Sequence, residues 1–329
     1  MIAIFKQETP ANIFLLLVFA VLIKLPMFLY PHAAITKPGD STLYKVISEF
    51  ISPFSKTIPV IYPVLAFVLL FVQAIMLTRF MNAQRMISLQ GYLPGVAYLL
   101  VTSLLPEWNY FSAPLIVNTI LLFVLIALFK TYNQQDIRGL VFNIGLALGV
   151  VSFLFFPAFS FIVWILFALA VMRPFRLNEW LLCIIGFTTP FYFYSVYLFI
   201  AGQWDWQNLL PHFSIGMPAI KQSAWLAGSA FLIALPFITG GYLVQDSLRR
   251  MLIQVRKGWS LLLLFLLGAF FLPFVNSGDS FENWILTAIP FAAFHASTYL
   301  YSSFRIFPMT IFWLSVAFIL AWQYYGPGW

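Results

Sequence analysis

The sequence contains very little charge. Only 8% of its 329 residues are Asp, Glu, Lys or Arg, whereas a soluble domain of this size carries about 25%. This shortage, together with 62% hydrophobic residues and a mean hydropathy of +0.94, excludes a soluble fold. The few charges lie almost entirely in short breaks between apolar runs. The sequence therefore predicts an all-α, polytopic transmembrane helix bundle.

Cysteine and histidine are also scarce. The one cysteine, Cys183, excludes an intramolecular disulfide and a metal site built from several cysteines, and we expect it only to pack, because it lies in an apolar run. The three histidines, His32, His212 and His295, are too scattered to form a metal site by spacing. His295 lies in a predicted span, where a hydrogen-bonded structural role is the more common one. The sequence predicts no metal ligands from Cys or His.

Long apolar runs fill most of the chain. The first run, 13–30, exceeds the 7–15 residues that are about the length of a signal-peptide core, so we interpret it as a retained membrane helix. If residues 140–172, with Pro157 at their turn, form a re-entrant pair, nine spans remain; otherwise there are about eleven. The eleven predicted spans are 11–30, 58–77, 88–105, 112–129, 140–156, 158–172, 180–200, 224–244, 259–275, 284–301 and 307–325.

The breaks between these runs alternate in charge. With a cytoplasmic N-terminus, the cytoplasmic segments hold 12 of the 17 Lys and Arg residues, the outer segments hold four, and Lys24 lies within a span. This bias predicts a multi-pass protein of the bacterial inner membrane, with its C-terminus outside if there are eleven spans. It also explains the net charge of +7 without a nucleic-acid partner. The basic run 249–257 is interpreted as a topology signal with anionic-lipid contacts.

No break is long enough for a separate soluble domain, so residues 1–329 are expected to form a single integral membrane domain. The longest break, 31–57, contains the sequence LYKVISEFISPF at 43–54. Its apolar residues share one face of a helix, and the other face carries Lys45 and Glu49. This pattern predicts a helix that lies in the outer membrane interface.

Asp40 is the candidate catalytic residue. It lies in KPGDSTLY, shortly after the first span, where Pro38-Gly39 favours a turn at the outer surface. A carboxylate there could act as a general base or bind a divalent cation. The alternative is that Asp40 caps the interfacial helix that follows it.

Lys24 is the charged residue deepest in a predicted span, and an intramembrane ionisable group is a functional candidate by default. It could contact a lipid phosphate, or its side chain could extend to the outer headgroups. Further candidate substrate-binding residues on the predicted outer side are Glu107, Asp205 and His212. Together with Asp279 and Glu282, the acidic residues could converge on one cavity and raise one another's pKa, or could be exposed loop charges.

Three stretches resemble the GT-C glycosyltransferase superfamily. Asp40 and Tyr44, before the interfacial helix, resemble the first outer loop of that superfamily, in which an acidic residue is catalytic and the sugar donor is usually a lipid-linked phosphate. Residues 143–171 resemble its small-residue helix and proline-broken pair, and 282–296 its late helix. Asn283 and Trp284 stand where an Arg-Tyr pair is often found, so the phosphate-binding Arg is missing. The whole chain also resembles a group of polytopic inner-membrane proteins from Bacteroidota.

The resemblance implies a GT-C-like protein that handles a polyprenyl-phosphate-linked sugar at the outer face, with Asp40 as base or cation ligand. Two alternatives remain open. A transporter or flippase would use the small-residue and proline-broken helices as moving parts. A non-catalytic membrane subunit of an envelope complex would need a fixed protein partner, which the sequence does not identify.

Overall fold

The computed structural model describes the chain apart from residues 1, 3, 35, 38, 206–214, 219–222, 276–280, 303, 305 and 327–329. All regular secondary structure in the described residues is helical, which confirms the all-α prediction. The α-helices are α1 (Pro10–Ile23), α2 (Leu25–Leu29), α3 (Thr42–Thr57), α4 (Ile61–Ala83), α5 (Leu93–Ser103), α6 (Ala113–Lys130), α7 (Arg138–Leu154), α8 (Phe161–Met172), α9 (Leu177–Ile200), α11 (Ala224–Ser247), α12 (Ile253–Phe271), α13 (Ala288–Tyr301) and α14 (Ile306–Tyr325). Short 3-10 helices are η1 (Ile4–Lys6), η2 (Pro106–Asn109), η3 (Phe156–Ser160), η4 (Leu248–Arg250), η5 (Leu272–Phe274) and η6 (Phe281–Thr287).

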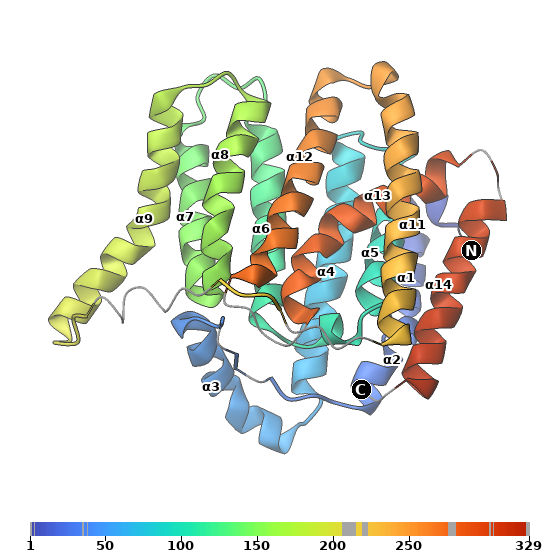
Figure 1. Ribbon diagram of the computed structural model, residues 1–329, viewed down its shortest axis with the longest axis horizontal. Coiled ribbons are helices and arrows are strands. Elements are labelled where there is room, and N and C mark those ends of the chain that lie inside the picture. Colours follow the sequence, from blue (N-terminus) through green and yellow to red (C-terminus); the bar gives the residue numbers. More distant parts are fainter. Residues whose placement is uncertain are drawn as a thin grey trace.

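Every predicted span contains a helix, and six helices in the described residues are long and apolar enough to cross a membrane: α4, α6, α9, α11 with η4, α12 with η5, and α14. The other spans correspond to shorter helices, such as α5 with 11 residues. Helices α7 and α8 form an antiparallel pair joined by η3 at Pro157, and they lie beside α6 and the first half of α9 (Figure 1). The number of membrane crossings stays a prediction.

The bundle has a basic and an acidic end. The loops α6–α7, α8–α9 and α11–α12 lie together at the top of Figure 1. A 3.0 Å hydrogen bond from Gln254 Nε2 to Gln84 Oε1 joins the α4–α5 loop to them. We call this the basic end, because these loops and the helix ends that flank them carry most of the Lys and Arg that were predicted to be cytoplasmic. The first loop, η2 and η6 meet at the opposite, acidic end. The cytoplasmic location of the basic end stays a prediction.

Helix α3 is amphipathic, unlike the apolar helices of the bundle, and it lies across the acidic end (Figure 1). It covers the predicted 43–54 segment. Its protein-facing side holds the buried Tyr44 and Ser48, whereas Phe50 and Phe54 on the predicted apolar face are exposed. Ile47 and Ile51 of the apolar face pack against the core, and its Phe50 and Phe54 side points away from the protein, as a helix on a lipid surface requires. Its location in the membrane interface remains a prediction.

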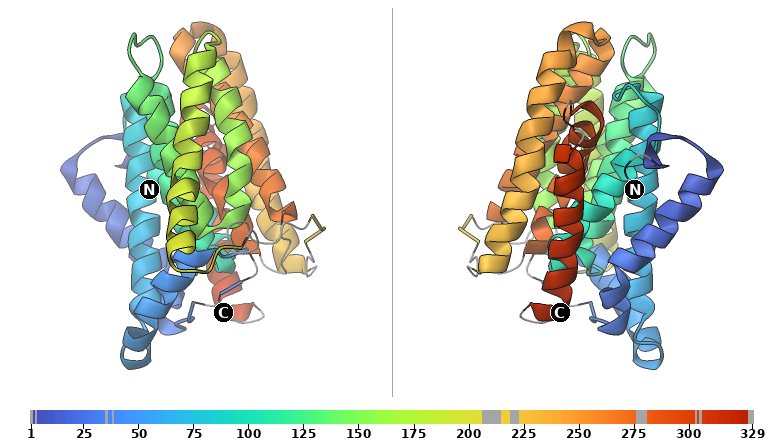
Figure 2. Two further views of the ribbon diagram at one scale, coloured as in Figure 1. Left: turned by 90° about the vertical axis from the view of Figure 1, so that its left-hand side faces the viewer. Right: turned by 90° about the vertical axis from the view of Figure 1, so that its right-hand side faces the viewer.

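Glycines let α7 and α9 approach very closely. A Cβ atom on Gly145 would stand 2.1 Å from the carbonyl oxygen of Cys183, and one on Gly186 would stand 2.2 Å from that of Phe142. Only glycine fits such a contact, which is typical of helix packing in membranes. Cys183 is fully buried at this contact. On the opposite side of the bundle, α14 packs beside α11 and α1 (Figure 2).

Candidate functional site

The loop that carries Asp40 is fixed to the turn after α7 by backbone hydrogen bonds. Ser41 N donates to the carbonyl of Leu154 at 3.1 Å, and Phe156 N donates to that of Gly39 at 3.1 Å. These bonds place Asp40 opposite Phe155 in an isolated antiparallel bridge. The first loop and the turn before Pro157, which the sequence analysis singled out separately, therefore form one unit at the acidic end.

The side chain of Asp40 does not cap α3. Its Oδ2 atom accepts a 2.7 Å hydrogen bond from the backbone N–H of Lys37, three residues before it and outside the helix. The N-cap residue of α3 is Ser41, which makes no side-chain capping bond. The capping alternative is therefore wrong. Asp40 is only 8% exposed, and this burial raises its pKa to about 6, although the Lys37 N–H and the charges of Lys37 and Lys45 oppose the shift.

Three carboxylates meet at the acidic end, and we call Asp40, Glu107 and Glu282 the acidic cluster. Burial raises the pKa of Glu282; the 2.7 Å ion pair with Lys37 opposes this, and the charges of Glu107 and Asp40 add to it. Glu107 accepts a hydrogen bond from the backbone N–H of Phe281. These three residues, from the first loop, η2 and η6, are therefore close enough for their charges to act on one another; their convergence on one cavity stays a prediction.

Tyrosines border the acidic cluster. The hydroxyl of Tyr44 donates to the carbonyl of Phe111 at 3.2 Å, and burial together with the charges of Asp40 and Glu282 raises its pKa. Burial and the nearby Glu107 and Glu282 charges raise the pKa of Tyr110 to about 12. Both hydroxyls therefore stay protonated at neutral pH, and the proton of Tyr44 is already donated to Phe111.

No group of three or more His, Cys, Asp or Glu side chains in the described part of the chain is arranged to hold a metal ion. The acidic cluster is held instead by the Lys37 ammonium and by backbone N–H groups. A divalent cation beside Asp40 stays a prediction without a described coordination site.

Lys24 lies between α1 and α2 and is 1% exposed. Its ammonium donates to Thr102 Oγ1 and Ser103 Oγ, both at 3.1 Å, and to Asn109 Oδ1. The side chain therefore does not extend to the membrane surface, and the snorkelling alternative is wrong. The cavity beside Asn109 has a volume of only 10 Å³, which is room for about one water molecule. This geometry favours a role for Lys24 in fixing the end of α5 to η2.

Of the remaining candidates that the structure describes, Asp205 and His295 do not act on the acidic cluster. Asp205 is exposed and follows α9, whose second half, after Pro190, extends away from the bundle (Figure 1). His212 and Asp279 lie outside the described residues. His295 is 2% exposed and its Nε2 lies 2.9 Å from the carbonyl oxygen of Ile233, which fits the structural role expected for it.

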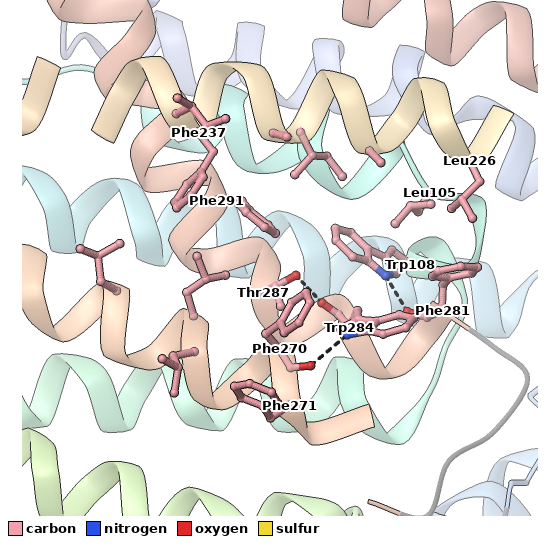
Figure 3. Close-up of a pocket in the computed structure, with 17 residues that line it drawn as sticks. Leu105, Trp108, Leu226, Phe237, Phe270, Phe271, Phe281, Trp284, Thr287 and Phe291 are labelled. Carbon is pink, nitrogen blue, oxygen red and sulfur yellow. Dashed lines mark hydrogen bonds between the residues drawn. The ribbon is translucent and has the colours of Figure 1, made fainter. Parts of the chain in front are cut away.

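A large apolar groove, which no pattern in the sequence predicted, reaches the acidic end. It has a volume of 860 Å³ and lies between α11 and α12, with η6 and α13 as its floor (Figure 3). Trp108, Phe281 and Trp284 lie toward one end, and Phe237 and Phe291 toward the other. The full lining is Leu105, Trp108, Leu226, Ala230, Ile233, Ala234, Phe237, Ile238, Leu263, Leu266, Leu267, Phe270, Phe271, Phe281, Trp284, Thr287 and Phe291.

The polar atoms inside this groove are already bonded within the protein. Trp108 Nε1 donates to the carbonyl of Phe281 at 2.8 Å, and Trp284 Nε1 donates to that of Phe270 at 3.2 Å. Thr287 donates to the carbonyl of Trp284 at 2.6 Å. The groove therefore offers an occupant almost only apolar surface, which suits a hydrocarbon chain. Its Trp108 and Phe281 rim adjoins Glu107 and Glu282 in the sequence.

The fold is similar to one solved structure, the crystal structure of ArnT from Cupriavidus metallidurans bound to undecaprenyl phosphate. The TM-score is 0.47 at 12% sequence identity, and the alignment covers 89% of this chain. This chain spans 60% of the length of that protein. No protein-family model and no curated protein sequence matches the chain.

Proposed function

We propose that this protein handles a lipid-linked sugar at its acidic end, as a GT-C-like glycosyltransferase with Asp40 as the catalytic carboxylate. The observation that supports the proposal is the apolar groove between α11 and α12, because its Trp108 and Phe281 rim adjoins the acidic cluster. A hydrocarbon chain in the groove would bring its polar head to Glu107, Glu282 and Lys37. Under this proposal the acidic end faces outward from a bacterial inner membrane, as the basic loops favour.

The groove selects for an apolar chain with a polar head at one end. Ile238, Leu263 and Leu267 line it and are themselves exposed, so a lipid could enter sideways between α11 and α12. The charges near the Trp108 end come from the acidic cluster and Lys37, and the ammonium of Lys37 is the cation that would meet a phosphate there. Undecaprenyl phosphate is bound in the ArnT structure; for this chain a polyprenyl-phosphate-linked sugar is part of the proposal.

Asp40 suits general base catalysis. A base is most effective when its pKa lies near the working pH, and burial raises the pKa of Asp40 to about 6. The carboxylate is held in place by the Lys37 N–H bond at Oδ2. In the proposed reaction the Asp40 carboxylate takes the proton of an acceptor hydroxyl as that oxygen attacks the anomeric carbon. The bond from this carbon to the lipid phosphate breaks, and the phosphate leaves with the bonding electrons.

Two variants test the proposal in separate steps. Ala234→Trp fills the groove and should reduce binding of undecaprenyl phosphate, measured by native mass spectrometry; Val68→Trp, at a half-exposed position on α4, is the matched control. Asp40→Asn should keep lipid binding and lose sugar transfer to an acceptor in reconstituted vesicles. Unchanged binding in Ala234→Trp would exclude the groove as the lipid site.

The same measurements separate the alternative functions. A flippase would move the bound lipid across the vesicle membrane, and Asp40→Asn would leave that movement intact. A non-catalytic subunit would show neither transfer nor a response to Asp40→Asn. Full transfer activity in the Asp40→Asn variant would reject Asp40 as the base.

A further inference from the structure

A second, polar pocket lies at the basic end, at the other end of the bundle from the acidic cluster. It has a volume of 570 Å³ and lies between the loop after α4, the loop between α11 and α12, and the end of α13. Its polar lining comes from Arg85, Ser88, Asp246, Ser247, Arg250 and Tyr301, and its apolar lining from Leu243, Met251, Leu252 and Val255.

Hydrogen bonds between separate segments hold the walls of this pocket together. Ser88 N donates to the hydroxyl oxygen of Tyr301 at 3.0 Å, which ties the loop after α4 to the end of α13. Gln254 Nε2 donates to Gln84 Oε1 at 3.0 Å and ties the same loop to α12. Because the Tyr301 hydroxyl acts as acceptor here, its own proton is left for a ligand. The pocket is therefore a preformed feature of three segments distant in sequence.

Arg85 has an unusual backbone conformation, with φ at +52°. Met86 N donates to the carbonyl of Met81, and Arg85 N to that of Asn82, both at 3.0 Å. These two bonds form a Schellman motif at the end of α4, and the position of Arg85 in this motif is usually occupied by glycine. The left-handed conformation disfavours a residue with a Cβ atom. The chain thus has a guanidinium where the backbone prefers glycine.

The two arginines of the pocket are free to bind a ligand. In the part of the chain that the structure describes, neither Arg85 nor Arg250 has a side-chain hydrogen bond or an ion pair, and Asp246 is not within ion-pair distance of either. Guanidinium groups match the geometry of phosphate oxygens. Leu252 is 65% exposed at the same pocket, so an apolar side chain open to the surroundings lies in the same pocket as the arginines.

We propose that this pocket binds the phosphate group of an anionic phospholipid, with Arg85 and Arg250 on the phosphate and Leu243 and Leu252 along the start of an acyl chain. Asp246 would accept hydrogen bonds from headgroup hydroxyls, and the Tyr301 hydroxyl would donate to a phosphate oxygen. The membrane leaflet that faces basic loops is rich in anionic lipids. The proposal is independent of the chemistry at the acidic end.

The test compares three probes on the purified full chain: phosphatidylglycerol, phosphatidylcholine and inorganic phosphate, each followed by native mass spectrometry and by the shift in Tm. Phosphatidylglycerol should bind and raise Tm, and phosphatidylcholine should not. Arg250→Gln and Arg85→Gly should each weaken phosphatidylglycerol binding about tenfold, because each removes a charged hydrogen-bonding group. Arg249→Gln is the matched control, because it removes the same charge one residue away from the pocket lining.

Arg85→Gly separates binding from folding. Glycine removes the left-handed strain at this position, so the variant should be at least as stable as the wild type without lipid and still lose the lipid-dependent rise in Tm. Equal weakening in all three variants would show nonspecific attraction to the basic end and overturn the proposal. A full Tm shift with inorganic phosphate, to which phosphatidylglycerol adds nothing, would assign the pocket to free phosphate and overturn the lipid assignment.

Discussion

Lys37 in the first loop and Glu282 at the start of η6 form an ion pair of 2.7 Å, although they lie near opposite ends of the sequence. Glu282 is 8% exposed, and the charges of Asp40 and Glu107 act against its ionised form. The ion pair therefore joins the Asp40 loop to the floor of the apolar groove and favours the charged form of a buried carboxylate.

The first prediction follows from that pair. Lys37→Met should destabilise the fold by about 2 kcal/mol at neutral pH, because it leaves the Glu282 charge buried without its partner. The loss should disappear at low pH, because the pKa of Glu282 rises further and its protonated form needs no cation. Thermal unfolding in nanodiscs measures this, with Lys45→Met on exposed α3 as the control. Adding Glu282→Gln to Lys37→Met should restore most of the lost stability. A double variant that is as unstable as Lys37→Met alone would argue against the ion pair.

The second prediction concerns the stability cost of Asp40. Its folded pKa of about 6 lies above the ordinary aspartate value of 3.8, so the folded protein binds this proton more tightly than the unfolded chain does. The favourable contribution is fully present below pH 3.8 and is lost as the pH rises through about 6. Asp40→Asn should therefore exceed the wild type in stability by about 3 kcal/mol at neutral pH, and the difference should vanish in acid.

Unfolding of both proteins across this pH range measures the effect, with Glu49→Gln on the exposed side of α3 as the control. An Asp40→Asn variant that is less stable than the wild type at neutral pH would contradict the burial of the charge. If the variant is more stable and also loses transfer activity, the carboxylate is retained for its chemistry, because its effect on stability is unfavourable.

The third prediction concerns the pH dependence of the transfer rate if Asp40 is the base. If its carboxylate is the base, the transfer rate should fall about tenfold for each pH unit below its pKa of about 6, because only the ionised form accepts a proton. Lys37→Met should move this midpoint upward, because the Lys37 charge lowers the pKa of Asp40. The rate as a function of pH in reconstituted vesicles measures both effects. An unchanged midpoint in the variant would remove Asp40 from the rate-limiting proton transfer.

The sequence predicted the helices well because an apolar run leaves the backbone few alternatives in a bilayer. The segment 112–129 corresponds to α6 (Ala113–Lys130), and 43–54 lies within α3 (Thr42–Thr57). The predicted apolar face of α3 includes Phe50 and Phe54, which are exposed, while Tyr44 and Ser48 lie toward the protein. This exposure is what the prediction of a helix in the membrane interface requires.

The candidate site was predictable only in part. The charge alternation put Asp40, Glu107 and Glu282 on one side, and the structure places them at one end. The Asp40–Lys37 bond and the docking of the loop on Leu154 depend on tertiary contacts that no local pattern encodes. The groove was missed because its apolar lining looks like any other membrane helix. The closest signal is the pair of tryptophans in PEWN and FENW, Trp108 and Trp284, which line its acidic end.

The fourth prediction concerns the basic end, where Arg173 and Glu179 form a buried pair at 3.1 Å. Arg173 Nη1 also donates to the carbonyls of Thr131 at 2.8 Å and Gln134 at 2.6 Å, so it joins the α6–α7 and α8–α9 loops. Arg173→Met should destabilise the fold by about 3–5 kcal/mol, because it leaves Glu179 and two carbonyls without a donor. Arg176→Met is the matched control.

Arg176, the control residue, also pairs with Glu179, but its own side chain is exposed to solvent. Arg176 is 60% exposed and lies 3.8 Å from Glu179 Oε1, so solvent screens the pair and its loss should cost less than about 1 kcal/mol. Chemical unfolding in detergent micelles measures both variants. Equal losses for the two arginines would show that the Arg173 bonds to the loop carbonyls add nothing to stability.

The last prediction decides the role of Lys24. Its ammonium contacts the neutral groups of Thr102, Ser103 and Asn109, and the first two also donate to backbone carbonyls of α5. Methionine has a similar length and carries no charge that must be buried, so Lys24→Met should change stability by less than about 2 kcal/mol. Lys24→Ala should cost more, because it adds a cavity to the loss. In both variants the affinity for undecaprenyl phosphate should equal that of the wild type, measured by native mass spectrometry. If Lys24→Met keeps its stability and loses the lipid, the lysine contacts the phosphate and the α5–η2 junction must open during binding.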